Sequence, residues 1–318
     1  MADRPKRVEI HEEGPREGFQ IEPGPISTAA KVEFIEALAE TGLREVQSAS
    51  FVDPRRVPGW ADADEVARAI RRRPDVRYTC IWLNQRGLER AVATPLDIVG
   101  SIQLSASETF SLRNTNRDTS QTLAEQRKTL DFCKARGIAV TDAIVMTAFG
   151  CNYEGFISSE RVRECVGVLL DLAAEYELQL SCVRLADTMG WANPTTVERI
   201  VGTVRERWPD LRLGLHLHDT RGTGMANALA GLQMGIDYFD SSCAGLGGCP
   251  FAGHQSAAGN ICTEDLVYMC EEMGIETGID LERLIECARM AERIVGHPLP
   301  GKLMHAGSLQ PYRARNDS

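Results

Sequence analysis

Two histidines at the end of one predicted strand are the first candidates for chemistry. Residues 211–219 alternate leucine with other residues, which places the leucines on one face of a strand and His216 and His218 on the other. Imidazoles one pleat repeat apart, about 6.5 Å along a strand, can converge on one cation. A polar interior without a ligand is the alternative explanation. Their position at the carboxyl end of the strand favours a metal site.

Other side chains that could do chemistry also follow predicted strands. Arg16 and Glu17 come after the first strand and supply a planar cation beside a carboxylate, or else form a solvated turn. Asp187 follows the sixth strand, where its alternative role is the N-cap of the next helix. Asn260 can offer an amide oxygen to a hard cation.

A glycine-rich segment follows the eighth predicted strand. Residues 243–260 include Cys249 and His254 among several glycines. Such a segment suits a lid that closes over a substrate, because glycine moves at little steric cost. A thiol near a metal or an arginine can act as a general acid or base, so Cys249 is a candidate for that role. A loop cysteine without a function is the alternative.

Alternating strands and helices must position these residues. The predicted strands are Arg7–His11, Glu45–Ala49, Val76–Leu83, Ile98–Ser105, Ala139–Thr147, Gln179–Leu185, Leu211–His218 and Tyr238–Ser242. Segments with helical spacing are Thr28–Thr41, Ala63–Arg72, Gln85–Ala93, Thr122–Arg136, Ser159–Glu177, Thr195–Trp208 and Gly224–Met234, with Thr263–Met273 and Asp280–Val295 after the last strand.

This order predicts one α/β domain over residues 1–318. Eight strand and helix units in about 250 residues are typical of a (β/α)8 TIM barrel, here over about residues 7–262, with extra C-terminal helices over about residues 263–296. A doubly wound sheet is the alternative, but no Gly-x-Gly-x-x-Gly follows the first strand to support it. In a barrel, chemistry is expected where strands end and their following loops begin.

Composition narrows the class of partner. The chain has 318 residues, 43% of them hydrophobic, and its formal charge is 35 − 45 = −10. Nucleic acid and anionic membranes are therefore disfavoured, and a small-molecule enzyme is expected. No apolar run reaches the roughly 18 residues of a membrane span, and the first residues lack an apolar signal core, so we expect a cytoplasmic protein. The ten cysteines include no Cys-x-x-Cys pair and are expected to be reduced and mostly buried.

Several motifs resemble those of 3-hydroxy-3-methylglutaryl-CoA lyases, which are HMGL-like members of the DRE-TIM metallolyases. They are the runs 14–16, 50–58, 216–222 and 244–250, with 259–260 followed by 263–268, and the likeness spans about residues 7–296 in the same order. The resemblance implies a (β/α)8 barrel that binds Mg²⁺ or Mn²⁺. It also implies retro-Claisen cleavage of a 3-hydroxyacyl-CoA into acetyl-CoA and a keto acid.

The resemblance assigns roles by position. His216, His218 and Asn260 match the metal ligands of the family, and Arg16 matches its catalytic arginine. Asp187 matches an acid/base residue and Cys249 the cysteine of the lid. Either His216 or Asp187 would remove the proton of the substrate hydroxyl, and the sequence does not choose between them.

Three departures from the family pattern fall at the expected site. Glu17 stands where the family has an aspartate ligand, so a metal held by Glu17 requires a shift of the backbone or the ion. Gln47 stands where the family has an active-site glutamate. The lid is two residues longer than usual and carries His254, which we expect to enter the closed site and partly replace the missing charge.

These departures leave the choice of substrate open. We expect a lyase for 3-hydroxy-3-methylglutaryl-CoA or a similar thioester, with citramalyl-CoA or another branched hydroxyacyl-CoA as the nearest alternative. A Claisen-condensing synthase, a non-catalytic acyl-CoA-binding homologue and an iron oxygenase are further alternatives. The phosphates of CoA require a cationic rim, for which Arg55, Arg56, Arg113 and Lys302 are candidates. A homodimer is possible.

Overall fold

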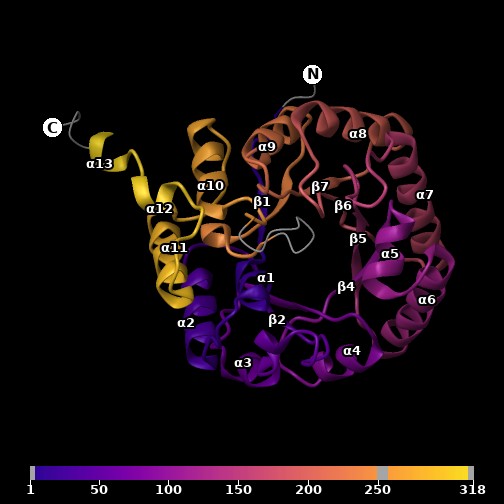
Figure 1. Ribbon diagram of the computed structural model, residues 1–318, viewed down its shortest axis with the longest axis horizontal. Helices are drawn as coiled ribbons and strands as arrows, with labels where there is room; N and C mark the ends of the chain where they lie inside the picture. Colours follow the sequence, from indigo (N-terminus) through magenta and orange to yellow (C-terminus); the bar gives the residue numbers. More distant parts are fainter. Residues whose placement is uncertain (1–3, 249–256, 314–318) are drawn as a thin grey trace.

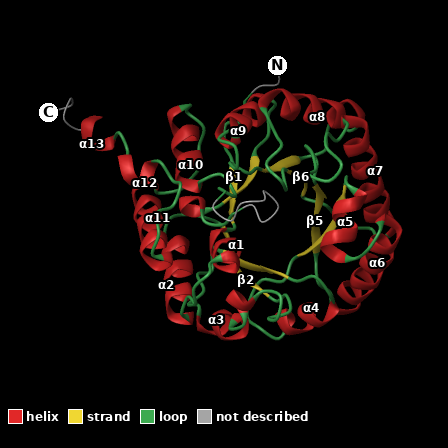
Figure 2. Cartoon of the chain, in the orientation of Figure 1, coloured by secondary structure: helices red, strands yellow, loops and turns green. Residues whose placement is uncertain are grey.

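The computed structural model describes residues 4–248 and 257–313. Eight parallel strands form the inner wall of a ring of helices, as Figures 1 and 2 show. The strands are β1 (Glu9–Glu12), β2 (Glu45–Ser50), β3 (Arg77–Ile81), β4 (Gly100–Ser105), β5 (Val140–Met146), β6 (Cys182–Ala186), β7 (Leu213–His216) and β8 (Tyr238–Ser241). Each lies within or beside a predicted run, so the expected TIM barrel is confirmed.

The strand ladder runs in the order β3-β2-β1-β8-β7-β6-β5-β4. Within the described ranges 4–248 and 257–313, no ladder joins β3 to β4, and the residues that precede β4 close this gap instead. The backbone N–H of Asp97 donates to the carbonyl of Tyr78 at 2.9 Å, and the Tyr78 N–H donates to the Asp97 carboxylate at 2.8 Å. This seam lies across the ring from β7 and β8, which carry the candidate histidines and their neighbours.

All the helices expected from the spacing form. They are α2 (Thr28–Ala39), α3 (Ala63–Ala69), α4 (Gln85–Val92), α6 (Thr119–Arg136), α7 (Ser159–Glu175), α8 (Pro194–Arg207), α9 (Gly224–Gln233), α10 (Thr263–Glu272) and α11 (Leu281–Val295). Their ends carry common capping signals. Ser27 caps α2 by accepting from the N–H of Ala30 at 3.2 Å, and Gly274, at φ +72°, follows the end of α10.

The pattern missed several short elements. These are α1 (Gly14–Ile21), α5 (Glu108–Thr115), α12 (Leu303–Ala306) and α13 (Gln310–Arg313), with single 3₁₀ turns at Pro58–Trp60 (η1) and Cys243–Gly245 (η2). The important omission is α1, because it carries Arg16 and Glu17. Its run of charged residues had suggested a turn, but Pro15 suits the first turn of a helix, where its missing N–H is no loss.

Two layers of side chains line the strands, one apolar and one polar. Leu213, Leu215 and Leu217 are fully buried toward the surrounding helices, as the alternation predicted. The inner face of the strands instead carries buried polar groups, among them His11 and Asp240. The hydrophobic stability of the barrel therefore comes from its outer layer, and its interior is left for charged groups.

The C-terminal helices lie outside the ring. Helix α11 packs against α2, and α10 and α12 pack beside it, as expected for helices that follow the barrel (Figure 1). No described helix is long and apolar enough to cross a membrane. The nine cysteines within the described residues are all buried and unpaired, which confirms the expectation of reduced thiols for that part of the chain.

Candidate active site

The two histidines of the His-x-His pair converge at the carboxyl end of β7. Nε2 of His216 lies 3.3 Å from Nε2 of His218, and the ring centroids are 5.2 Å apart. Two ligands in adjacent positions around an ion about 2.1 Å away are about 3 Å apart, so this spacing fits a shared cation. The geometry therefore agrees with a metal site rather than with two independent core histidines.

Asp240 on β8 fixes the orientation of His216. Its carboxylate lies 3.2 Å from Nδ1 of His216, which places the ring proton on Nδ1 and leaves Nε2 directed at His218. Burial lowers the pKa of His216, but the hydrogen bonds to Asp240 and Glu13 outweigh it and raise the pKa well above its usual value. His218 behaves oppositely, since burial and the neighbouring His216 lower its pKa to about 3. A neutral His218 is the form that binds a metal.

Asn260 is brought to His218 by a short backbone pairing. The two residues form an antiparallel bridge, and the Ile261 N–H donates to the carbonyl of Leu217 at 3.1 Å. Both are buried. Within residues 4–248 and 257–313, neither the amide oxygen nor the amide nitrogen of Asn260 has a hydrogen-bond partner, and Nδ1 of His218 has none either. Buried polar atoms seldom stay unpaired, so the free amide oxygen fits a ligand to a hard cation.

Glu17 completes a group of possible ligands with His216 and His218. The ligand atoms of the three residues lie within 4.8 Å of one another. One carboxylate oxygen of Glu17 is 4.0 Å from Nε2 of His218, and the other is 3.0 Å from Nη1 of Arg16. Helix α1 therefore lets the longer Glu17 side chain face both the histidines and the arginine.

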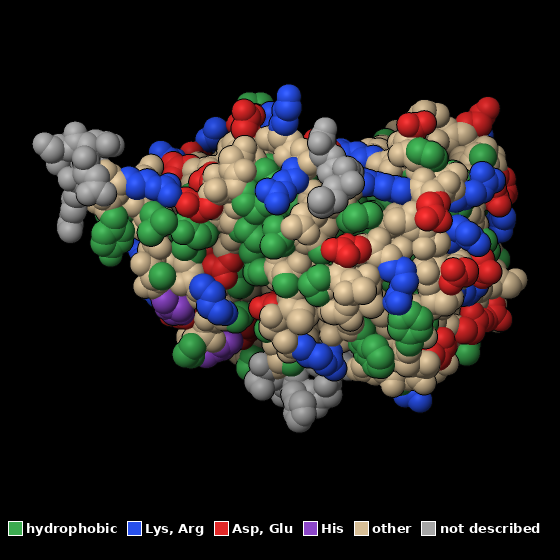
Figure 3. Space-filling view, turned by 90° about the horizontal axis from the view of Figure 1, so that it is seen from above, with side chains coloured by type: hydrophobic (Ala, Val, Ile, Leu, Met, Phe, Trp, Pro, Cys, Tyr) green, Lys and Arg blue, Asp and Glu red, His purple; other side chains and the backbone are tan. Residues whose placement is uncertain are grey.

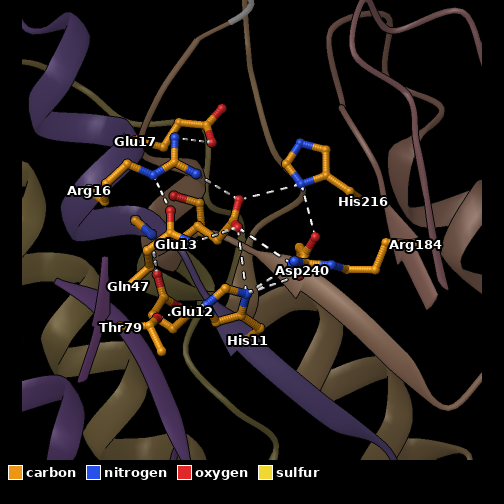
Figure 4. Close-up of polar contacts among 12 residues, drawn as sticks. His11, Glu12, Glu13, Arg16, Glu17, Gln47, Thr79, Arg184, His216 and Asp240 are labelled. Carbon is orange, nitrogen blue, oxygen red and sulfur yellow. Dashed lines mark hydrogen bonds and ion pairs between the residues drawn. The ribbon is translucent and has the colours of Figure 1, made fainter. Parts of the chain in front are cut away.

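Arg16 and His216 lie on either side of the Glu13 carboxylate, as Figure 4 shows. The Arg16 guanidinium donates to the amide oxygen of Gln47 on β2, and its Nη2 donates to Glu13 at 3.1 Å. The same Glu13 oxygen is 3.4 Å from Nδ1 of His216. Arg16 is therefore joined to the histidine pair through one carboxylate.

Glu13 was missed by the sequence analysis. It is buried, and the nearby cations Arg16 and His216 outweigh the effects of burial and of Asp240, so its pKa is lowered to about 2. Period-two alternation along β1 could have found it, because His11 and Glu13 share the inner face. Asp240 was missed for a similar reason, since it lies within a predicted strand and not at its end.

A second group of possible metal ligands lies deeper in the barrel. The candidate atoms of His11, Glu13 and Asp240 are within 4.8 Å of one another, and all three residues are buried. The guanidinium of Arg184 enters this group, with Nη1 2.9 Å from Asp240 and 4.0 Å from Glu13. Figure 4 shows these side chains together. Because a fixed cation already neutralises the carboxylates, this group is an ion-pair network rather than a second metal site.

Asp187 lies at the end of β6, beside His216. Its backbone N–H donates to the carbonyl of His216 at 2.8 Å. Its Oδ1 accepts from the N–H groups of Trp191 and Ala192, whereas Oδ2 is buried without a partner among the described residues. Burial raises the pKa of Asp187 to about 6 despite these hydrogen bonds. It is not the N-cap of α8, a role that Asn193 takes.

Two predicted site residues lie outside the described ranges, namely Cys249 and His254. Three of the four residues predicted to form a cationic rim make side-chain contacts within the protein. Arg55 pairs with Asp53, Arg113 stacks over the ring of Tyr153 at 4.2 Å, and Lys302 donates to the carbonyl of Pro300 at 2.5 Å. The face of the molecule in Figure 3 intersperses lysine and arginine with aspartate and glutamate, and it shows no single basic patch.

The comparisons with known proteins agree with this arrangement. The HMGL-like family matches residues 7–291. The hydroxymethylglutaryl-CoA lyase YngG of Bacillus subtilis is 40% identical over 298 residues, which are 94% of this chain and 96% of the relative. The (R)-citramalyl-CoA lyase of Chloroflexus aurantiacus is 39% identical over 314 residues, or 96% of each chain.

A solved structure adds a liganded example. The HMG-CoA lyase from Acinetobacter baumannii, in complex with coenzyme A and 3-methylmalate, superposes with a TM-score of 0.85 at 38% identity and covers 98% of each chain. The chain described here belongs to the HMGL-like family. It is a carbon–carbon lyase of that family, so the alternatives of a non-catalytic binding homologue and an iron oxygenase are set aside.

Proposed function

We propose that the protein cleaves a branched 3-hydroxyacyl-CoA, with 3-hydroxy-3-methylglutaryl-CoA as the first candidate, into acetyl-CoA and a keto acid. The observation that carries the proposal is the pairing of a candidate histidine metal site with Arg16 through Glu13, at one end of the barrel. The named relatives support the substrate class, and the complex with coenzyme A and 3-methylmalate supports an acyl-CoA as the partner.

The proposed metal ligands are His216, His218, Asn260 and Glu17. The two imidazole nitrogens and the amide and carboxylate oxygens fit a hard divalent cation, which we propose to be Mg²⁺ or Mn²⁺. When bound, such a cation polarises the substrate hydroxyl and lowers its pKa. Asp240 accepts from Nδ1 of His216, so this ring would bind a metal through Nε2 on releasing its second proton, whereas the low pKa of His218 keeps that ring neutral.

Arg16 is proposed to stabilise the enolate. Breaking the C2–C3 bond sends an electron pair into the thioester carbonyl, so negative charge develops on that oxygen. The guanidinium is held by Glu13, Glu17 and Gln47, which fix its plane before substrate arrives. A donor fixed in this way stabilises the developing charge without reorganisation, and losing one typically costs about 100- to 1000-fold in kcat.

Asp187 is the better candidate for the base that removes the hydroxyl proton. His216 uses Nδ1 toward Asp240 and directs Nε2 at His218, so both of its nitrogens are engaged. Asp187 has one carboxylate oxygen without a hydrogen-bond partner among the described residues. The proton goes from the 3-hydroxyl to Asp187, the ketone forms at C3, and the enolate carbon C2 takes up a proton. Cys249 as the donor of that second proton stays a prediction from sequence.

Two relatives with different substrates match this chain almost equally well, so citramalyl-CoA is the second candidate. A product assay separates the two. With Mn²⁺, we expect the purified protein to release acetyl-CoA and acetoacetate from 3-hydroxy-3-methylglutaryl-CoA. Faster release of acetyl-CoA and pyruvate from citramalyl-CoA would instead identify the second candidate. Mass spectrometry resolves the two keto acids. 3-Methylglutaryl-CoA, which lacks the hydroxyl, should remain intact.

Variants link that activity to the site. Arg16→Gln should lower kcat by about 100-fold or more, and Asp187→Asn should lower it without loss of bound metal. Glu272→Gln removes a surface pair with Arg313 and serves as the control. The proposal fails if the metal-loaded wild-type protein cleaves neither thioester. A cytoplasmic location and a homodimer stay predictions from sequence.

A further inference from the structure

Glu13 is a buried carboxylate that holds Arg16 but is neither a proposed metal ligand nor a proton donor or acceptor in the steps above. It directly follows β1, and its side chain is only 5% exposed. Its Oε2 lies 3.1 Å from Nη2 of Arg16 and 3.4 Å from Nδ1 of His216. Its Oε1 accepts from the amide of Gln47 at 3.3 Å. Figure 4 shows the carboxylate between Arg16 and His216.

The shared oxygen couples two groups that are far apart in the sequence, although β8 alone separates their strands, β1 and β7, in the barrel. Arg16 lies on α1 at the start of the chain, and His216 ends β7 about two hundred residues later. Each must contact a different part of one substrate, so their separation decides whether both can act at once. A misplacement of about 1 Å in such a site can cost about 100-fold in rate.

We propose that Glu13 is a positioning residue that sets the distance between the enolate-stabilising Arg16 and the metal-binding histidine pair. The inference rests on the proposed function, because it assigns Arg16 and His216 to one reaction. Glu13 itself is held in place from below, where Nδ1 of His11 is 3.5 Å from its Oε1 and Nη1 of Arg184 is 4.0 Å away. These contacts fix the carboxylate against the wall of the barrel.

The neutral side chain of Gln47 contacts both Glu13 and Arg16. Its amide oxygen accepts from Nε of Arg16, and its amide nitrogen donates to Glu13, so each end of the amide has a defined partner. A carboxylate at position 47 would still accept from Arg16 but would face Glu13 at a distance of about 3 Å, where two like charges repel. The cluster around Arg16 therefore accommodates one negative charge shared between positions 13 and 47.

Exchanging the two side chains by isosteric changes tests the role of Glu13. Glu13→Gln should lower kcat by about 100-fold while KM changes little, because the loss falls on alignment in the transition state. Gln47→Glu alone should also lower kcat. The double variant Glu13→Gln with Gln47→Glu restores one carboxylate beside Arg16 and should recover about tenfold in kcat over Glu13→Gln, the size expected of coupled neighbours.

Glu36→Gln is the matched control. Glu36 is a largely buried carboxylate on α2, 16% exposed, and its ion pair is with Arg71. We expect Glu36→Gln to lower the melting temperature and to leave kcat and KM within about twofold, because its partner lies away from Arg16 and His216. Glu13→Asp, which keeps the charge, provides a second variant if Glu13→Gln does not fold and should retain more kcat than a neutral side chain.

The outcomes separate this inference from the proposed function. If the wild type cleaves a hydroxyacyl-CoA but Glu13→Gln keeps full kcat, or the double variant is no faster than Glu13→Gln, then Glu13 does not position Arg16. If the wild type cleaves nothing on the panel, the proposed function is wrong. Melting curves and Mn²⁺ affinities measured on each variant distinguish loss of alignment from loss of folding or of metal.

Discussion

One carboxylate oxygen of Asp240 lies 3.2 Å from Nδ1 of His216, while the other lies 2.9 Å from the guanidinium of Arg184. Arg184 on β6 thus holds the carboxylate, and the carboxylate holds the ring whose Nε2 faces His218. The cation comes from β6, the anion from β8 and the imidazole from β7, which lies between them in the sheet. Asp240 is therefore expected to affect the affinity of the protein for a divalent cation.

Asp240→Asn should weaken metal binding. The amide can no longer fix the Nδ1 proton of His216, and losing such an outer partner typically costs about 10- to 100-fold in affinity. Calorimetric titration of the metal-free protein with Mn²⁺ measures the change in the dissociation constant. Asp237→Asn is the control, because Asp237 pairs with Arg212 away from the histidines. Equal Mn²⁺ affinities in the wild type and Asp240→Asn would show that the contact does not support a ligand.

Metal removal should lower the thermal stability of the wild type. A cation that binds only the folded state, at a free concentration of about 100 times its dissociation constant, stabilises that state by about 2.7 kcal/mol. Mn²⁺ should therefore raise the melting temperature of EDTA-treated protein, and His218→Ala or Asn260→Ala should abolish the rise. His305→Ala removes an exposed histidine and should keep it. A rise that persists in both site variants would place the cation elsewhere.

Stability should fall as the pH rises because of Glu264. Burial raises the pKa of this carboxyl to about 8, whereas its ordinary value is 4.5, even though the N–H of Ala244 donates to it. Between pH 4.5 and about 8 the folded protein keeps a proton that the unfolded chain has lost, so each pH increment favours unfolding. Glu12, with its pKa raised to about 7 by burial, acts in the same direction over a narrower range.

Glu264→Gln tests this linkage. The variant keeps a neutral side chain of the same shape, so its melting temperature should equal that of the wild type at pH 5 and exceed it increasingly toward pH 8. The surface variant Glu272→Gln should follow the wild type throughout. Parallel curves for wild type and Glu264→Gln would mean that Glu264 does not hold a proton in the folded protein.

Gly14→Ala should destabilise the start of α1. A Cβ at this position would lie 2.5 Å from Oε1 of Glu12, the oxygen that accepts the Gly14 N–H at 2.7 Å. Crowding of this kind costs about 1–3 kcal/mol. Gly24→Ala is the matched control, because a Cβ there meets nothing within 4 Å. Thermal melts of both variants make the comparison, and a Gly14→Ala protein as stable as Gly24→Ala would show that Glu12 can move aside.

The sequence predicted the class of fold and where several candidate site residues lie. Period-two alternation in residues 211–219 placed His216 and His218 on one face, and the strand order placed Asp187 and Asn260 at the same rim. These inferences succeeded because side-chain direction in a strand is a local property. Helix α1 was missed because its charged residues gain their order from Glu13 and Gln47 rather than from spacing.

The amino-acid sequence by itself determined the barrel, its helices and the residue types gathered at its carboxyl rim, since these follow from periodicity along the chain. Only the tertiary structure decided that Glu13 lies beside Gln47 and Arg16, and that Arg184 enters the deeper group of His11, Glu13 and Asp240. Asp240 and His11 meet across 229 positions of sequence. Such contacts depend on how the strands close around one axis, and the local spacing of residues does not predict that closure.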